Sequence, residues 1–362
     1  MAGNLLQALR DRRAPVPRQE GFVFEATQRC NHDCLHCYNV WKNPVGYPGG
    51  DLPTAETLDL LDRMVAQTGA RLITLSGGEP LLRPDLFEVV DHLAARSLAL
   101  NLITNGRLLD ARAIERLADK VSVFELPLLS ADREIHDRLS GAPGAFDRVT
   151  AALTELTRAR AKVVVVFVAT RLNLPGWREA AELALALGAD ALMFNRFNPG
   201  GRGRENVGLL QASPAELEAA LDVAERLAVR HEVPISCSIA LPPCLIDMRR
   251  FPHLAHGYCA AGTASAYFTL DPLGNVRPCN HSPLILGNLR ETGFIAMARS
   301  APMRAFLAAR PDYCQGCAME RICQGGCKAA GEACAGSPCA MDPFLAAFHT
   351  QARRPELPID EP

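Results

Sequence analysis

Three cysteines near the N-terminal end share one short segment, so they can bind a metal group together. They are Cys30, Cys34 and Cys37, spaced C-x3-C-x2-C within TQRCNHDCLHCYNVW. Three thiolates can hold three irons of a cubane cluster, which leaves the fourth iron without a protein ligand. A structural zinc site closes with four ligands instead, and His32 or His36 would complete one here. The spacing favours an iron–sulfur cluster with an open iron.

Two glycine-containing turns follow the cysteine triplet. The first is Ser76-Gly77-Gly78-Glu79-Pro80, and the second is Thr104-Asn105-Gly106. Glycine lets the backbone approach a ligand closely, and a carboxylate such as that of Glu79 accepts hydrogen bonds from an ammonium group. Either turn alone is typical of an ordinary strand-to-helix connection. Their order after the triplet favours a ligand site.

Ten of the thirteen cysteines lie beyond residue 232. Cys259, Gly274 and Cys279 form a C-x14-G-x4-C pattern. A C-x2-C-x5-C-x3-C run follows, made of Cys314, Cys317, Cys323 and Cys327, and Cys334 and Cys339 lie beyond it. Thiols stay reduced in the cytoplasm, so such clusters indicate metal rather than disulfides. Zinc ribbons need fewer thiols, which favours iron–sulfur clusters here as well.

These motifs lie on an alternating pattern of strands and helices. The sequence predicts strands at Phe22–Ala26, Leu72–Ser76, Leu98–Thr104, Val121–Leu126, Val163–Thr170 and Ala191–Phe194. It predicts helices at Thr54–Thr68, Asp85–Ser97, Asp110–Ala118, Ala145–Arg160 and Trp177–Leu187. Six β/α units predict a parallel sheet with outer helices, an α/β fold in the form of a partial (β/α)6 barrel. Functional groups should lie at the carboxyl ends of its strands.

The division of the chain follows from where this rhythm ends. We expect an N-terminal extension at 1–20, the barrel with a helix capped by Ser213 at 21–231, a small cysteine-rich domain at 232–350 and a tail at 351–362. A hairpin turn at Gly274-Asn275 should bring Cys259 and Cys279 together.

Composition and charge exclude several classes of function. There are 38 Lys and Arg against 40 Asp and Glu, a net charge of −2, so nothing favours binding to nucleic acid or to anionic lipid. No segment has the apolar length of a membrane span or of a secretory signal, which predicts a cytoplasmic protein.

The triplet and the two turns resemble the signature of the radical S-adenosylmethionine (SAM) superfamily. The resemblance implies that SAM binds the open iron and is cleaved reductively to a 5′-deoxyadenosyl radical, which abstracts hydrogen from a substrate. It assigns Gly77, Gly78, Glu79 and Pro80 to the methionine amine of SAM, and Thr104, Asn105 and Gly106 to the ribose. An aromatic residue usually precedes the last cysteine and meets the adenine; here that position is His36.

The C-terminal cysteines resemble the SPASM domain, which binds auxiliary [4Fe–4S] clusters, so we expect one or two of them. The resemblance assigns Cys259, Cys279 and Cys327 to a first cluster, for which Cys244 is the preferred fourth ligand and an open iron is the alternative. It assigns Cys314, Cys317 and Cys323 to a second cluster. The family's last cysteine commonly follows an Asp-Pro pair, but Phe344 and Leu345 follow Asp342-Pro343 here, so Cys339 is preferred as the fourth ligand and Cys334 is the alternative.

The resemblance implies a SAM-dependent oxidoreductase or maturase acting on a peptide or protein, with a small molecule such as a tetrapyrrole or sugar as the alternative substrate. A non-catalytic metal-binding adaptor is a third reading. A flavodoxin- or ferredoxin-type protein would supply electrons. Because only about 20 residues precede the first strand, a peptide would be recognised by the barrel or through a separate leader-binding protein.

Two further residues are candidates for chemistry at this site. His281 is a candidate base beside Cys279, although an exposed loop histidine is the alternative. Arg196 follows the sixth strand and can chelate a carboxylate, unless the stretch Arg196–Asn206 is an interdomain linker.

Overall fold

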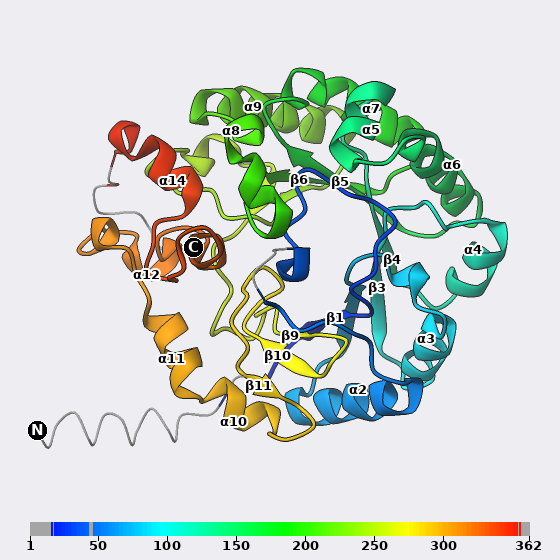
Figure 1. Ribbon diagram of the computed structural model, residues 1–362. Coiled ribbons are helices and arrows are strands. Elements are labelled where there is room, and N and C mark those ends of the chain that lie inside the picture. The colour runs from blue at the N-terminus through cyan, green and yellow to red at the C-terminus, as the bar shows by residue number, and fades with distance from the viewer. Residues whose placement is uncertain (1–15, 17, 43–45, 354, 356–362) are drawn as a thin grey trace, which may run out of the picture.

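A partial barrel of parallel strands with helices outside it forms most of the molecule (Figure 1). The computed structural model describes residues 16, 18–42, 46–353 and 355. Most of the expected N-terminal extension and of the tail therefore lies outside the described residues. The six barrel strands are β1 (Gly21–Glu25), β2 (Leu72–Ser76), β3 (Ala99–Ile103), β4 (Val123–Pro127), β5 (Val163–Ala169) and β6 (Ala191–Arg196).

Each barrel strand lies within three residues of its predicted position at either end, and neighbours pair in parallel in chain order. The helices of this part are α2 (Thr54–Thr68), α3 (Leu86–Ala94), α4 (Ala111–Leu117), α5 (Arg133–Ser140), α6 (Ala145–Arg158), α7 (Trp177–Ala186), α8 (Val207–Leu210) and α9 (Pro214–His231). The sequence missed α5, although Asp132 caps its start and Gly141 ends it in the left-handed conformation. Ser213 caps α9 as expected, in a reciprocal pair with Glu216.

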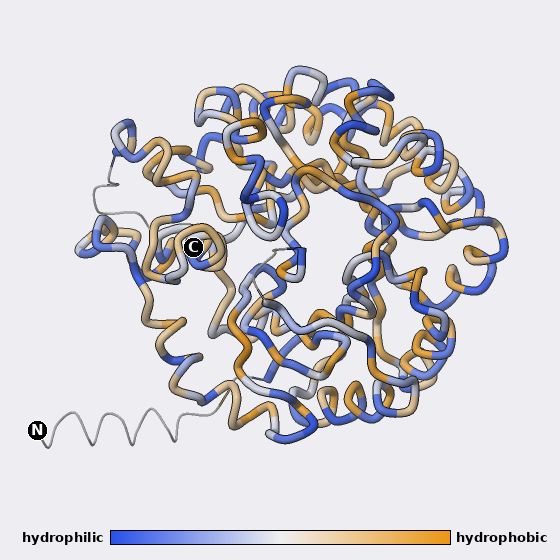
Figure 2. The backbone as a smooth tube through the Cα atoms, viewed as in Figure 1, coloured by the Kyte–Doolittle hydropathy of each residue, from blue (hydrophilic) through white to orange (hydrophobic). Residues whose placement is uncertain are grey.

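Alternation along the strands separates the core from the barrel interior. In β5, Val163, Val165, Phe167 and Ala169 are buried, and the residues between them are half-buried. The first set packs under the helices: the Phe167 ring lies 4.6 Å from that of Trp177 on α7. Figure 2 shows hydrophilic and hydrophobic residues interleaved along the outer helices. The half-buried set faces the barrel interior and is available to line a cavity.

Strands beyond residue 232 extend the barrel sheet at both of its edges. They are β7 (Ile235–Cys237), β8 (Leu254–His256), β9 (Thr269–Leu270), β10 (Asn275–Arg277) and β11 (Gly287–Asn288). The order of the sheet is β11-β10-β9-β1-β2-β3-β4-β5-β6-β7-β8, with β7 parallel to β6 and β9 parallel to β1. The division expected at 232 therefore separates two sequence regions within one sheet. The predicted hairpin is confirmed as β9 and β10, with Gly274 at φ 86°.

Short helices complete the C-terminal region and lie beside the open side of the barrel in Figure 1. They are α10 (Phe294–Ala298), α11 (Ala301–Ala308), α12 (Glu320–Cys323), α13 (Lys328–Ala335) and α14 (Pro343–Phe348). Single 3-10 turns lie at Val40–Lys42, Pro80–Leu82, Leu174–Gly176, Gly201–Asn206 (η4), Met248–Arg250, Asp312–Cys314 and His349–Gln351. No helix in the described part of the chain combines the length and the apolar character that crossing a membrane requires.

Two buried ion pairs join the C-terminal region to the barrel. Arg277 on β10 pairs with Glu25 on β1, and Arg196 at the end of β6 pairs with Asp342 just before α14. All four side chains are almost completely buried. Removing one partner of such a pair would leave an uncompensated buried charge, which typically costs about 3–5 kcal/mol. The pairs therefore fix the cysteine-rich region against the barrel.

Candidate active site

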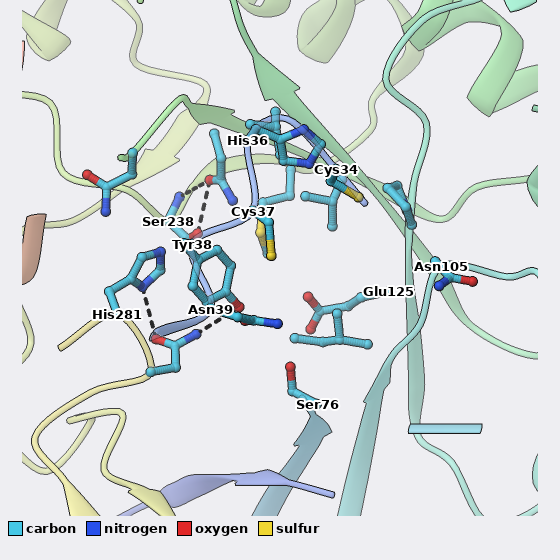
Figure 3. A pocket seen from close by; sticks show the side chains of 18 of the residues that line it. Cys34, His36, Cys37, Tyr38, Asn39, Ser76, Asn105, Glu125, Ser238 and His281 are labelled. Carbon is cyan, nitrogen blue, oxygen red and sulfur yellow. Dashed lines mark hydrogen bonds between the residues drawn. The ribbon is translucent and has the colours of Figure 1, made fainter. Parts of the chain in front are cut away.

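The cysteine triplet lines a cavity of about 270 Å³ at the carboxyl ends of the barrel strands. The loop that carries it follows β1, and backbone bonds hold it in place. The Leu35 amide donates to the Leu139 carbonyl at 3.0 Å, and the Cys37 amide donates to the Cys34 carbonyl at 3.2 Å. Cys30, Cys34 and Cys37 all reach the cavity, and Figure 3 shows the last two pointing into it.

The three thiols fit an iron–sulfur cluster chemically. Burial raises the pKa of each of them, and at Cys34 the charges of Cys37 and Cys30 raise it further. Such thiols do not ionise together unless a cation balances their charge, and cluster irons provide that balance. The donor set fits a cluster held by three cysteines.

The Gly- and Arg-rich stretch after β6 braces this loop. In η4, the Gly203 amide donates to the Cys37 carbonyl at 2.9 Å. Arg202 donates to the Asp33 carbonyl at 2.6 Å and forms an ion pair with the Asp33 carboxylate. The stretch therefore holds the cysteine loop in position, and its residues Arg196 and Asn198 also line the cavity.

Arg196, expected to chelate a carboxylate, is among the residues that line the main cavity, but its guanidinium is bonded to the protein. Its guanidinium is fully buried and bonds to the protein: Nε donates to the Ala240 carbonyl at 2.8 Å, Nη1 to the Phe197 carbonyl at 3.3 Å, and Nη2 to Asp342. The same Asp342 oxygen accepts from the Cys327 amide at 2.7 Å. Arg196 thus positions the Asp342 carboxylate, which in turn positions Cys327.

The first glycine turn presents its backbone to the cavity. Gly77 and Gly78 line it, and an added Cβ would lie 2.5 Å from the Thr27 carbonyl oxygen at Gly77 and 2.1 Å from that of Arg29 at Gly78. Only glycine permits this approach. Asn39, two residues after the last cysteine of the triplet, donates to the Gly77 carbonyl at 2.8 Å. The cysteine loop and the glycine turn therefore form one wall, which fits a ligand held by backbone groups.

Glu79 has a different position from the one expected. It is fully buried and is not among the residues that line the cavity. One carboxylate oxygen accepts from Thr104 Oγ1 at 2.7 Å and from the Leu81 amide at 3.2 Å, and the other accepts from the Asn105 amide at 2.8 Å. Glu79 therefore joins the two turns, and the expectation that it accepts a bond from a ligand ammonium group is wrong.

The second turn contributes two of its three expected residues. Thr104 and Asn105 line the cavity, and Asn105 Nδ2 donates to Asn31 Oδ1 at 2.7 Å in the cysteine loop. Gly106 and Pro80 lie behind the wall. An added Cβ at Gly106 would meet Leu126 at 3.1 Å, so this glycine serves packing under the strand.

Aromatic and imidazole groups form the opposite side of the cavity (Figure 3). His281 is half-buried and stacks on Tyr38 with ring centroids 4.0 Å apart, so it is not the freely exposed loop histidine of the alternative. Asn280 connects the same groups, because its Nδ2 donates to the Tyr38 hydroxyl at 3.1 Å. Burial and the charges of nearby arginines lower the pKa of His281 to about 3, and it is neutral.

His36, the other imidazole of interest, also lines the cavity. Burial lowers its pKa to about 4. Its Nδ1 is buried and has no hydrogen-bond partner among the described residues. A neutral ring with an unused polar atom is suited to meeting a ligand.

Glu125 is a cavity residue that the sequence reasoning missed. It lies on β4 between buried Phe124 and Leu126 and points into the cavity (Figure 3). Burial alone raises its pKa to about 6, and no described residue forms a hydrogen bond or ion pair with its carboxylate. The available signal was the alternation of the strand, which places Glu125 and Pro127 on the face opposite the core.

The three cysteines expected in the first auxiliary group affect one another electrostatically. Burial raises the pKa of Cys279 to about 12, and the charges of Cys327 and Cys259 add to the rise. Asn198 Nδ2 approaches the Cys327 sulfur at 3.3 Å. Asn280 and His281, which directly follow Cys279, line the main cavity. This group therefore lies next to the cavity.

The assignment of Cys244 to the first auxiliary group is wrong. It lines a second, small cavity together with Cys314, Cys317 and Cys323. The expected ligand Cys339 is exposed and does not line that cavity. The structure groups the C-terminal cysteines differently from the sequence pattern at these two positions.

Comparisons with known proteins support the same reading. Residues 24–184 match the model of the radical SAM superfamily, and residues 259–318 match that of SPASM, an iron–sulfur cluster-binding domain. The AdoMet-dependent heme synthase of Methanosarcina barkeri is 30% identical over 341 residues, which cover 89% of this chain and 95% of that protein. The chain belongs to the radical SAM superfamily. As a SPASM-family radical SAM enzyme it uses SAM, a [4Fe–4S] cluster and auxiliary iron–sulfur clusters.

Peptide-modifying proteins are also similar to this radical SAM enzyme. The PqqA peptide cyclase of Methylocella silvestris is 29% identical over 334 residues, covering 89% of this chain and 86% of that protein. The crystal structure of Streptococcus suis SuiB bound to precursor peptide SuiA superposes with a TM-score of 0.69 at 15% identity, covering 94% of this chain and 79% of that one. At that identity the match concerns the fold, and it agrees with a partial barrel followed by an auxiliary-cluster domain.

Proposed function

We propose that this radical SAM enzyme oxidises a peptide or protein substrate in the main cavity. One observation carries the proposal: Cys30, Cys34 and Cys37 line one wall of that cavity, and Asn280 and His281, which adjoin the first auxiliary group, line another. A substrate in this space would contact both walls at once. Two metal groups on either side of one substrate suit a reaction that removes a hydrogen atom and then an electron.

The cofactors would supply the redox chemistry, and the chain would supply the surroundings. When bound and reduced, SAM would supply a 5′-deoxyadenosyl radical for hydrogen-atom abstraction, and an auxiliary cluster would supply an acceptor for the remaining electron. Cys30, Cys34 and Cys37 would hold the first cluster. Gly77 and Gly78 would bind the methionine part of SAM through backbone groups, and Thr104, Asn105 and His36 would meet its ribose and adenine.

Apolar side chains and two proton acceptors complete the cavity. The apolar lining of the cavity excludes water around a reactive species. It is formed by Ile103, Val166, Val168 and Met193. A substrate that loses a hydrogen atom and an electron must also release a proton if it is to become neutral. Glu125 and His281 are the acceptors that face it. We propose Glu125 as the base, because its pKa of about 6 suits proton acceptance near neutral pH, with His281 next to the first auxiliary group as the alternative.

The peptide-modifying relatives support a peptide as the substrate class. A flavodoxin- or ferredoxin-type protein would reduce the first cluster, and a separate leader-binding protein is a possible partner. The test is anaerobic reconstitution with iron and sulfide, followed by incubation with SAM, dithionite and any short peptide that a neighbouring gene encodes. We expect 5′-deoxyadenosine together with a peptide about 2 Da lighter. Formation of 5′-deoxyadenosine with no change in any such peptide would count against the peptide proposal.

A tetrapyrrole is the second candidate substrate. The observation that favours it is the match to the heme synthase of Methanosarcina barkeri, which extends over 95% of that protein. The same assay with iron-containing tetrapyrrole carboxylates in place of peptides separates the two candidates. Oxidation of a tetrapyrrole side chain at a rate above that of any peptide would favour this second substrate class.

A further inference from the structure

Four cysteines from two distant parts of the chain line one small cavity. Cys314, Cys317 and Cys323 come from the C-terminal run, and Cys244 comes from the loop that follows β7. Seventy residues separate Cys244 from the next of these cysteines along the chain (314 − 244 = 70). Four thiols around one space match the ligand number of a cubane cluster with all four irons held by protein.

The loop that carries Cys244 is fixed in place by its own bonds. The Pro242 carbonyl accepts from the Leu245 amide at 2.9 Å and from the Ile246 amide at 3.1 Å. Ile246 is fully buried in the core, and the Cys244 carbonyl accepts from the Arg353 amide at 2.8 Å. This turn holds the Cys244 side chain toward the small cavity.

The C-terminal cysteine run forms the other side of the small cavity. Gly325 has φ 87°, and a Cβ built on it would lie 2.6 Å from Pro311 and 3.5 Å from the Cys314 sulfur. Burial raises the pKa of Cys323 to about 11, and hydrogen bonds from the backbone amides of Gly325 and Gly326 to its sulfur partly offset that rise. Backbone donors directed at sulfur are typical of iron–sulfur sites.

The electrostatics agree with this grouping. Burial raises the pKa of Cys244 to about 12, and the charges of Cys323, Cys314 and Cys317 contribute to the rise. Cys237 provides the contrast, because burial alone raises the pKa of this thiol on β7. Cys237 does not line the small cavity that Cys244 shares with those three thiols.

The downstream cysteines do not occupy this position. Cys334 and Cys339 are exposed, and neither lines the small cavity. Leu345, three residues after Asp342 in the segment that commonly carries the last SPASM cysteine, lines the cavity with an apolar side chain. The downstream segment therefore closes the site, and the upstream loop supplies the fourth sulfur.

We propose that Cys244, Cys314, Cys317 and Cys323 hold the second auxiliary [4Fe–4S] cluster, with Cys244 as its fourth ligand. The cluster then connects the loop after β7 to the C-terminal run, and no iron in it is open to substrate. It serves electron transfer and the folding of this region. This inference rests on the family assignment and is independent of the substrate.

The experiment compares three variants of the full-length chain after anaerobic reconstitution. Cys244→Ser should lose up to about four iron atoms per chain, or keep a second auxiliary cluster with a shifted electron paramagnetic resonance signal and a shifted midpoint potential. Cys237→Ser and Cys339→Ser should match the wild type in iron, sulfide and spectra. Loss of the cluster in Cys339→Ser with an unchanged Cys244→Ser would overturn the assignment.

A second measurement keeps the proposal testable if Cys244→Ser does not fold. Wild-type holoprotein is treated anaerobically with iodoacetamide before and after the iron is removed by a chelator, and labelled cysteines are identified by mass spectrometry. Cys244 should be labelled only after iron removal, together with Cys314, Cys317 and Cys323. Cys339 should be labelled in both states. Labelling of Cys244 in the holoprotein at the rate of Cys339 would refute its role as a ligand.

These outcomes are distinguishable from a failure of the proposed function. Iron content, spectra and labelling report on the second auxiliary group directly. Formation of 5′-deoxyadenosine reports on the cluster of the triplet and on SAM.

Discussion

Replacement of Glu79 by glutamine tests whether this residue joins the two turns of the cavity wall. Its carboxylate accepts three hydrogen bonds, from Thr104 Oγ1 at 2.7 Å, from the Leu81 amide at 3.2 Å and from the Asn105 amide at 2.8 Å. Glutamine keeps one acceptor oxygen and replaces the other with an NH2 group. If the oxygen stays on the Thr104 side, the NH2 group faces the Asn105 amide, and two donors oppose each other.

Two opposing energies set the expected size of the effect. Losing a hydrogen bond to a charged group and leaving a buried donor unsatisfied costs about 1.5–3 kcal/mol. Removing the buried charge is favourable: burial, only partly offset by its three hydrogen bonds, raises the pKa of Glu79 from 4.5 to about 6, which corresponds to roughly 2 kcal/mol. The free energy of unfolding of the whole chain should therefore change by only about 1 kcal/mol. The loss of the hydrogen bond from the Asn105 amide still weakens the structure locally.

The assay therefore reads the local effect. Hydrogen–deuterium exchange of the reconstituted protein, followed by mass spectrometry of peptides covering residues 104–107, should be faster by about 10- to 100-fold in Glu79→Gln, since 1.4 kcal/mol corresponds to a factor of ten. The dissociation constant for SAM, measured by equilibrium dialysis, should rise by about tenfold or more, because Thr104 and Asn105 line the cavity.

Glu125→Gln is the matched control, because this carboxylate is in the same cavity and its pKa is also raised to about 6, with no bonding partner among the described residues. It should leave exchange at residues 104–107 unchanged. Unchanged exchange and SAM affinity in Glu79→Gln would refute the role assigned to Glu79, and so would equal effects in the two variants.

Two further substitutions test the supports of the site. Gly78→Ala places a Cβ 2.1 Å from the Arg29 carbonyl oxygen, so SAM affinity measured by equilibrium dialysis should fall by more than about tenfold; wild-type affinity would show that the turn tolerates a side chain. Asp342→Asn breaks the buried pair with Arg196 and should lower the free energy of unfolding by about 3–5 kcal/mol, measured by urea denaturation. The control Asp247→Asn removes an exposed pair and should cost no more than about 1 kcal/mol; equal losses in the two variants would contradict the structural role of Asp342.

Much of the fold could be predicted because it depends on local patterns. Short apolar runs placed all six barrel strands, and α2 was predicted with the bounds that the structure gives it. Gly274 marked the hairpin of β9 and β10 because the turn between these strands requires a residue in the left-handed conformation. Helix α5 was missed because its eight residues present too few apolar positions for a clear helical period.

The sequence by itself determined those parts of the site that lie within one loop. Cys30, Cys34 and Cys37 converge because seven or fewer residues separate them, and Gly77 and Gly78 approach the cysteine loop because the turn ending β2 requires their small size. Close spacing along the chain limits how far apart the side chains can lie, so the sequence pattern alone predicts that they are neighbours.

Tertiary structure alone decided the contacts between distant segments. Arg196 has the charge of a ligand clamp, but packing of the C-terminal region gives it Asp342 as a buried partner. Cys244 joins Cys314, 70 residues away, because β7 extends the barrel sheet and carries the following loop to the cysteine run. The type of a residue determines which bonds its side chain can form. The partner that it meets depends on how the strands and loops are arranged around the whole sheet.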